Sequence, residues 1–421
     1  MSLFTSTQFA SAAACGTDWR DTSKNILEKL EAVRTENDKF NFGFLYISDH
    51  LADDAGSILN LFRSVMHIDN WIGSVGMGIV GCGEAYIDQP AVSALIGRFP
   101  EEDFCIFPKV HVDGAFGRGD QDGKENTQQA IKDWLGANDP MLTFVHCDPM
   151  AEDDPIPTLQ ELERVTGGFI VGGLTSSRGA HIQIANAACE NSVSGCFFSQ
   201  GVNVATMLSQ GCEPISDMHT ITKADYNVIE ELDGHNALEV FQQDLKKIAA
   251  ERTGHTEKVF EEKLKTIDYP EQAPDEYKTL FKGQIHAAIP VSLSDQKDYM
   301  VRNLTGIEPA EGSIAISQPI YAGDRVLFVE RGEHSVTSDL SRSLLALRER
   351  VQNTYGTFEP KGAIYVSCIA RGFSEFQHPK NYEMDLIREI IGSVPLAGFY
   401  AGGEINNSRL YSYTGILTLF L

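Results

Sequence analysis

The sequence is short of positive charge and of long apolar runs. It has 34 Lys and Arg residues against 59 Asp and Glu residues, a formal net charge of −25, and no basic stripe. Because nucleic acids and anionic membranes are bound by clustered Lys and Arg, this composition argues against both as partners. The apolar runs are too short to cross a bilayer, and the N-terminus lacks a basic region followed by an apolar one. We expect a cytoplasmic protein without membrane insertion.

Motifs that mark several common chemistries are also missing. The eight cysteines are scattered, and no two have CxxC spacing, which argues against a disulfide framework and a structural zinc site. The sequence contains no Gly-x-Ser-x-Gly elbow, Walker phosphate loop or His-Glu-x-x-His helix. We therefore expect reduced, mostly buried thiols, and we assign neither a catalytic residue nor a metal ligand.

One pattern occurs three times in the chain. Each copy is an apolar strand, a helical segment and a second apolar strand ending in glycines, which is the order of a βαβ crossover. The copies are expected at residues 44–78, 142–173 and 363–404, and each is followed by a further small, apolar strand, at residues 91–97, 192–198 and 413–420. The fold class predicted is α/β, with mixed β-sheets built from repeated βαβ-plus-strand modules in two domains. Independent βαβ units of common type remain the alternative to three related modules.

A shift in composition near residues 214–284 predicts the domain boundary. Residues 218–222 and 227–234 are expected to form a strand, a turn and a strand, and a charged helical stretch is expected from residue 237 to about residue 266. Short strands at hairpin spacing are expected at residues 284–288, 299–304, 313–316 and 325–330. The predicted parts are an N-terminal helical lead-in over 1–40, whose helix starts near Ala12–Cys15, a domain over 40–235, a charged helical connector over 236–280 and a domain over 281–421.

Several segments dispersed along the chain resemble segments of the FIST family, the F-box and intracellular signal transduction proteins, and they occur in the order found in that family. The matching segments are residues 170–174, 209–215, 228–234, 301–304, 367–372 and 398–405. The resemblance covers roughly residues 40 to 421 and implies FIST N-terminal-like and C-terminal-like domains at 40–235 and 281–421.

The resemblance implies a sensory, ligand-binding role rather than a particular reaction. Small molecules such as amino acids are the expected ligands, and a subset of the family resembles haem-dependent nitric-oxide sensors. We expect signalling through a separate partner protein, because 421 residues leave no room for an output domain beside the two sensory domains. The oligomeric state stays open, as does the cofactor, with haem as one alternative.

The expected ligand site lies at the end of the third repeat. Cys368 ends an apolar strand and Arg371 follows three residues later, while Glu404 comes directly after Gly402 and Gly403. Open α/β sheets bind ligands at such strand ends. Arg371 would bind an α-carboxylate and Glu404 an α-amino group; a buried structural thiol, a surface arginine and a merely structural Glu404 are the alternatives. We expect Arg371→Ala to weaken the ligand response with little loss of folding, and Gly402→Val to damage both.

Further residues complete the prediction. Gly173 and Ser176 belong to a turn that resembles an anion-binding turn, and Arg302 would supply another positive charge. A cysteine-dependent hydrolase or amidase is the enzyme alternative, although His146 and Cys147, as strand neighbours, should point to opposite faces. For haem, the histidines and cysteine formally available are His219, His235, His286 and Cys212, and we assign no ligand among them.

Overall fold

The computed structural model describes residues 3–5, 8–33, 40–111, 116, 124–256, 258–259, 262, 285–291, 298–373 and 381–421. The chain forms two compact units. Residues Met1–Ser209 and Asp339–Leu421 form one, which we call the three-sheet unit, and Gln210–Ser338 form the other, which we call the barrel unit. Among the residues with a described position, no helix combines the length and apolar character needed to cross a lipid bilayer.

The first predicted repeat is confirmed in the three-sheet unit. Strand β3 (Phe42–Ser48) leads through helix α2 (Ala55–Met66) to strand β4 (Asn70–Gly76), which pairs with β3 in parallel. Strand β7 (Ala91–Gly97) returns and pairs with β3 in the antiparallel sense on its other side. The order β7-β3-β4 is therefore one parallel βαβ unit extended by one antiparallel strand.

The second and third repeats have the same pairing, with one parallel and one antiparallel neighbour on the first strand of each. The second comprises β9 (Pro140–Cys147), α4 (Pro155–Thr166), β10 (Phe169–Leu174) and β13 (Val193–Ser199). The third comprises β23 (Gly362–Cys368), α10 (Tyr382–Ile391), β24 (Leu396–Ala401) and β27 (Gly415–Phe420). The identical strand order supports three related modules.

An additional strand precedes each module and pairs with its last strand. These strands are β2 (Phe9–Cys15), β8 (Phe104–Val110) and β14 (Val204–Ser209). The prediction of a helix starting near Ala12–Cys15 is therefore wrong, and helix α1 runs over Trp19–Ala32. The small side chains of β2 are almost all buried against β7, so tertiary packing overrides the helix propensity of alanine.

The modules exchange hairpins in a cycle. In each module, the chain forms a short hairpin after the second parallel strand, and this hairpin completes the sheet of another module. The hairpin β5–β6 (Gly78–Gly81, Glu84–Ile87) joins β24, β11–β12 (Gln183–Ala185, Ala188–Cys189) joins β4, and β25–β26 (Glu404–Asn406, Arg409–Tyr411) joins β10. Every sheet of this unit therefore needs strands from two modules, and none is complete within one repeat.

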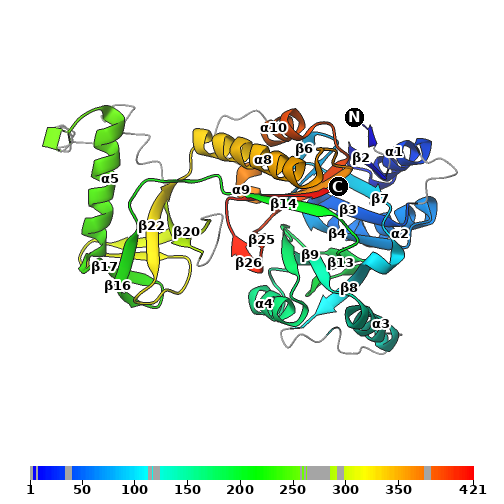
Figure 1. Ribbon diagram of the computed structural model, residues 1–421, viewed down its shortest axis with the longest axis horizontal. Coiled ribbons are helices and arrows are strands. Elements are labelled where there is room, and N and C mark those ends of the chain that lie inside the picture. Colours follow the sequence, from blue (N-terminus) through cyan, green and yellow to red (C-terminus); the bar gives the residue numbers. More distant parts are fainter. Residues whose placement is uncertain are drawn as a thin grey trace. The chain divides into compact units, whose positions relative to one another are not determined.

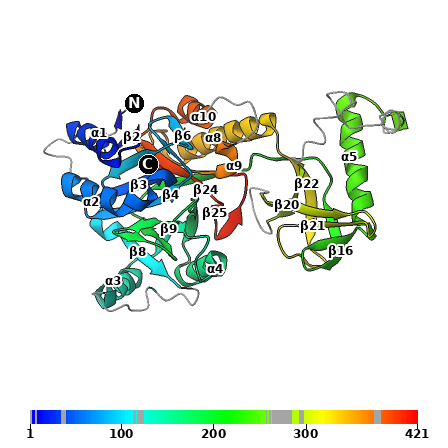
Figure 2. The ribbon, with the colours of Figure 1, turned by 180° about the vertical axis from the view of Figure 1, so that it is seen from behind.

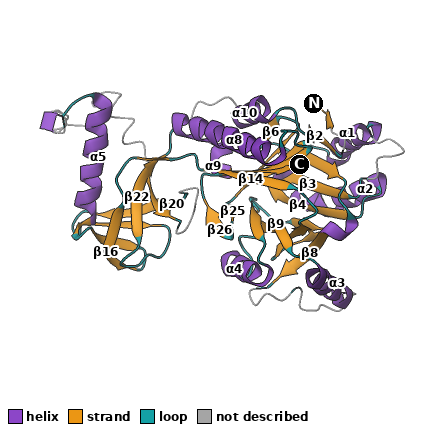
Figure 3. Ribbon diagram, viewed as in Figure 1, coloured by secondary structure: helices purple, strands orange, loops and turns teal. Residues whose placement is uncertain are grey.

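The three sheets lie inside this unit, and helices cover their outer faces (Figures 1 and 3). Helices α1 and α2 pack on the first sheet, α3 (Lys124–Ala137) and α4 on the second, and α8 (Glu333–Tyr355) and α10 on the third. Aromatic rings from all three sheets meet between their inner faces: Phe44 lies 6.1 Å from Phe144, and Tyr46 stacks on Phe399 at 5.3 Å between ring centroids.

The barrel unit is a closed antiparallel barrel that helix α5 (Ala237–Thr253) accompanies. Its strands pair in the ring β22-β16-β17-β21-β20-β19, and β19 pairs again with β22. They span β16 (His219–Asp225), β17 (Val228–Leu232), β19 (Ile285–Pro290), β20 (Tyr299–Glu308), β21 (Ser313–Ile316) and β22 (Arg325–Glu330). Helix α5 lies beside the barrel strands (Figure 2). Its Leu238 and Phe241 belong to the barrel core.

The expected strand–turn–strand and the four short strands are confirmed, and the structure joins all of them in one barrel. The expected helical stretch is described as a helix from Ala237 to Thr253, and most of the expected connector beyond it lies outside the described residues. The barrel unit is inserted in the third module, between β14 and the part of α8 that begins at Asp339. In the first module, residues 16–18 alone bridge the corresponding gap between β2 and α1.

Candidate functional site

The end of the third sheet gathers most of the predicted site residues. Cys368 is the last residue of β23, and the short helix α9 (Ile369–Gly372) carries Arg371. Glu404 begins β25, where it lies opposite Gly173 of β10. The charge of the Arg371 guanidinium and a hydrogen bond from the Cys368 thiol both act to lower the pKa of the Glu404 carboxyl group. Three residues predicted from separate segments thus meet at the carboxyl ends of β23 and β24.

Arg371 is buried in this cluster. Its Nε donates a hydrogen bond of 2.7 Å to Oε1 of Glu383, and the side chain is 1% exposed, so the alternative of a surface arginine is wrong. Burial alone would lower the pKa of Arg371, but the negative charge of Glu383 raises it well above its usual value. Arg371 is therefore a permanent buried cation, and its removal would leave Glu383 buried without its partner, which argues against our expectation that Arg371→Ala causes little loss of folding.

Four side chains satisfy the carboxylate of Glu383. Besides Arg371, the hydroxyl of Tyr365 donates to Oε1 at 2.8 Å, and the hydroxyls of Ser367 and Tyr400 donate to Oε2 at 3.0 and 3.5 Å. Both oxygens of Glu383 therefore accept two hydrogen bonds each. The result is a buried polar network whose donors come from β23, β24 and α9.

Glu404 is buried beside this network with one oxygen occupied. Its Oε2 accepts hydrogen bonds from the backbone N–H and the hydroxyl of Thr414, at 3.0 and 2.7 Å. Its Oε1 is buried without a hydrogen-bond partner, and so is Nη2 of Arg371. Burial raises the pKa of Glu404 to about 8, although the bonds from Thr414 and the charge of Arg371 act to lower it.

The raised pKa of Glu404 predicts that stability falls as pH increases. Between its ordinary value of 4.5 and about 8, the folded protein keeps a proton that the unfolded chain releases. A pKa difference of one corresponds to about 1.4 kcal/mol, so we expect a decrease of a few kcal/mol in the free energy of unfolding from pH 5 to pH 8. Glu404→Gln stays neutral at both pH values, so urea denaturation of this variant should show most of the pH-dependent decrease in the free energy of unfolding removed. Glu389→Gln, on the exposed face of α10, should retain the decrease. An unchanged pH dependence in Glu404→Gln would contradict the assignment.

The glycines and Ser176 have mainly packing roles at this end. Gly402 is exposed, and a Cβ there would make only an ordinary contact of 3.4 Å, which argues against our expectation that Gly402→Val damages folding. A Cβ on Gly403 would press on Leu410, and one on Gly173 would press on Ala401. Ser176 links all three modules, because its hydroxyl donates to the carbonyl of Tyr400 in the third and accepts from the N–H of Met77 in the first.

Arg302 lies in the barrel unit and does not belong to this cluster. Its Nε donates to Oε1 of Gln318 at 2.6 Å, and its Nη1 donates to the carbonyl oxygen of Val301. The predicted site residues are therefore divided between the two compact units, with Arg302 alone in the barrel.

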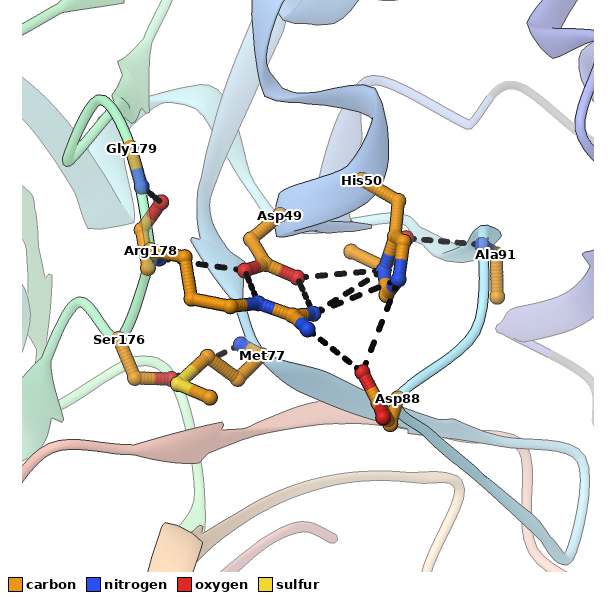
Figure 4. Close-up of polar contacts among 10 residues, drawn as sticks. Asp49, His50, Met77, Asp88, Ala91, Ser176, Arg178 and Gly179 are labelled. Carbon is orange, nitrogen blue, oxygen red and sulfur yellow. Dashed lines mark hydrogen bonds and ion pairs between the residues drawn. The ribbon is translucent and has the colours of Figure 1, made fainter.

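Figure 4 shows a second polar cluster, at the carboxyl end of the first sheet. Arg178 binds Asp49 in a bidentate way, donating hydrogen bonds from Nε at 2.7 Å and from Nη2 at 2.8 Å. Its Nη1 donates to Asp88 at 2.7 Å. Burial would raise the pKa of Asp49, but Arg178 lowers it overall. The turn around Arg178, expected to resemble an anion-binding turn, thus ties the second module to the first, with its guanidinium already bound by two carboxylates.

The residues considered for an enzyme do not form a reactive pair. His146 lies between the sheets, with Nε2 3.3 Å from the hydroxyl of Tyr46, whereas Cys147 lies in the apolar cluster on the opposite face. Burial lowers the pKa of His146 to about 3 and raises that of Cys147. The expectation that these two neighbours face apart is confirmed.

Of the histidines considered for haem, His219 is held by two carboxylates. The Nδ1 of His219 lies 2.7 Å from Asp233 and its Nε2 lies 2.9 Å from Asp244, so neither nitrogen is open to a metal. His235 is exposed, and burial lowers the pKa of His286 to about 4. Within the part of the chain that the structure describes, no group of three or more His, Cys, Asp or Glu side chains is arranged to hold a metal ion.

Sequence reasoning missed Glu383 and the hydroxyl groups around it. A signal was present, since Glu383 precedes Met384 and Ile387 in α10 and therefore lies at the edge of an apolar helix face. Ser367 likewise interrupts the apolar run of β23. Neither feature shows by itself that these residues meet Arg371, because that meeting depends on how α9 and α10 pack on the sheet.

Comparisons with known proteins identify two family domains in this chain. A family model of the FIST N domain matches residues 41–235, and one of the FIST C domain matches residues 237–407. An uncharacterized protein of Mycobacterium tuberculosis is 29% identical over 232 residues, which cover 52% of this chain and 52% of that protein. An uncharacterized protein of Mycobacterium bovis is 26% identical over 228 residues, 52% of this chain and 51% of that protein. The chain is thus aligned with about half the length of these relatives.

Proposed function

Because this chain belongs to the FIST family, whose domains are generally sensory domains of signal transduction, we propose that it is a cytoplasmic sensor of a small polar ligand. The ligand class is a free amino acid, bound where Cys368, Arg371 and Glu404 meet. The exposed Gly402 and the backbone of Gly403 border this place, and Gly173 and Ser176 support it from the second module. The signal passes to a separate partner protein.

One observation carries the proposal. Nη2 of Arg371 and Oε1 of Glu404 are buried and have no hydrogen-bond partner. Native proteins leave few such groups, and each costs about 1–3 kcal/mol or more when it is charged. An α-carboxylate on Arg371 and an α-amino group on Glu404 would satisfy both.

The protonation of Glu404 is consistent with this ligand class. With a pKa of about 8, Glu404 is largely neutral in the free protein at pH 7. A ligand ammonium group beside it would favour the carboxylate and lower that pKa. Because the site is buried, ligand entry requires local opening, and binding would shift the population toward the occupied state.

The test is thermal denaturation followed by circular dichroism with free amino acids, with acetate, with methylamine and with haemin. A ligand at about a hundredfold excess over its dissociation constant should add about 2.7 kcal/mol of stability. We expect stabilisation by an amino acid, but not by acetate or methylamine alone. Glu404→Gln should abolish it, and Asp385→Asn, at an exposed position of α10, should retain it.

Other outcomes would overturn the proposal. Stabilisation by haemin alone, with a Soret band that shifts on adding nitric oxide, would establish the haem alternative. Turnover in a panel of amides and esters that is lost in Cys368→Ala would establish the hydrolase. Stabilisation by an amino acid that persists in Glu404→Gln would place the site elsewhere in the molecule.

A further inference from the structure

We propose that Arg371 is also a positioning residue that couples the proposed ligand site to the two chain crossings leading into the barrel unit. The inference rests on the proposed function for its biological meaning, but the structural coupling can be measured without a ligand. The barrel unit is joined to the three-sheet unit after Ser209 and again before Asp339. Arg371 contacts the first crossing directly and is electrostatically linked to the second.

At the first crossing, Arg371 holds the last residue of β14. Its Nη1 donates to the carbonyl oxygen of Ser209 at 3.4 Å and to the Ser209 hydroxyl at 3.3 Å. It also donates to the carbonyl oxygen of Tyr413 at 3.4 Å. The next residue after Ser209 already belongs to the barrel unit.

The second crossing lies inside helix α8, between residues 338 and 339. Asp339 is the first residue of this helix in the three-sheet unit, it is nearly buried, and its charge contributes to the raised pKa of Arg371. On the barrel side, the hydroxyl of Ser335 donates mainly to the carbonyl oxygen of Gly332 at 2.9 Å and lies 3.4 Å from that of Gly211, so the two crossings are also in contact there. A change at Arg371 would therefore act directly on the first segment; the second segment, where Arg342 binds the Asp339 carboxylate, would be affected through the charge of Asp339 and through the first segment.

The geometry of the guanidinium explains how the coupling would work. Nε is held firmly by Glu383 at 2.7 Å, whereas the bonds from Nη1 to Ser209 are 3.3 and 3.4 Å and correspondingly weak. The third nitrogen, Nη2, is unpartnered. A carboxylate bound at Nη2 would reorient the planar fork about its Nε anchor, and the weak bonds to Ser209 would be the first to break.

Hydrogen–deuterium exchange measured by mass spectrometry tests this coupling in the full-length, ligand-free protein. Arg371→Lys keeps a positive charge beside Glu383 but lacks the planar guanidinium group. We expect it to speed exchange at residues 208–212 and 336–342 by about tenfold, because weak hydrogen bonds are lost. Peptides from β17 and β21 of the barrel should exchange as in the wild type. Arg388→Lys, at an exposed position of the neighbouring helix α10, is the matched control and should change nothing.

Ser209→Ala keeps the test valid if Arg371→Lys does not fold. It removes only the hydroxyl acceptor, and we expect a smaller increase confined to the same two segments. Unchanged exchange at both crossings, or a uniform increase across the whole unit, would overturn the inference. If exchange increases at the two segments but no amino acid stabilises the protein in thermal denaturation, only the proposed ligand is rejected. If an amino acid stabilises the protein but exchange does not increase, only the coupling is rejected.

Discussion

Glu383→Ala is expected to lower the free energy of unfolding by about 3–5 kcal/mol, because removing one partner of a buried ion pair leaves the other charge uncompensated. The uncompensated charge is Arg371, which stays buried among groups arranged to face a carboxylate. The hydroxyl groups of Tyr365, Ser367 and Tyr400 would lose their acceptor at the same time. Urea denaturation at pH 7 measures the loss.

Asp385→Ala provides a matched control two residues along the same helix. Asp385 also pairs with an arginine, Arg388, at 2.6 Å, but both side chains are about half exposed. Exposed pairs of this kind contribute about 0–1 kcal/mol, so this variant should unfold almost as the wild type does. Similar losses of unfolding free energy in both variants would show that the buried Arg371–Glu383 pair stabilises the protein no more than the exposed pair does.

Gly398→Ala should be similarly damaging, at about 3 kcal/mol, through backbone overlap rather than charge. Gly398 lies in β24 opposite Tyr365 of β23, and a Cβ there would overlap the Tyr365 carbonyl oxygen. Gly73 and Gly172 occupy the same register position in the other modules, where a Cβ would overlap the carbonyl oxygens of Leu45 and Val145. If the modules are structurally equivalent, alanine at each of the three positions should cost a similar amount.

Gly402→Ala is the control for these substitutions. It lies at the end of the same strand as Gly398, but it is exposed and a Cβ would have room. We expect a change within about 0.5 kcal/mol, as for most surface substitutions. Wild-type stability in Gly398→Ala, measured by thermal and urea denaturation, would mean that the strands of the third module separate easily and that the glycine is not required there.

The sequence predicted the repeated elements well because their signals are local. The alternation of apolar residues and the glycines at strand ends located β3, β9 and β23 and their partners within a few residues. The small, alanine-rich segment of β2 was misassigned, since its burial comes from β7, about eighty residues away. The same limit applied to the candidate site: Cys368, Arg371 and Glu404 were found from their positions at strand ends, but Glu383 was not.

By itself, the sequence determined the βαβ-plus-strand modules, the family, and the strand ends at which charged side chains gather, because each depends on short-range periodicity and on residue types. Only the tertiary structure decided that the modules exchange hairpins in a cycle and that residues 210–338 form a separate barrel within the third module. It also decided that Arg371 is buried with Glu383 while Arg302 lies elsewhere. These features arise from pairings between strands and helices far apart in the chain, where the apolar faces of several segments must be buried together, and no local pattern specifies which faces meet.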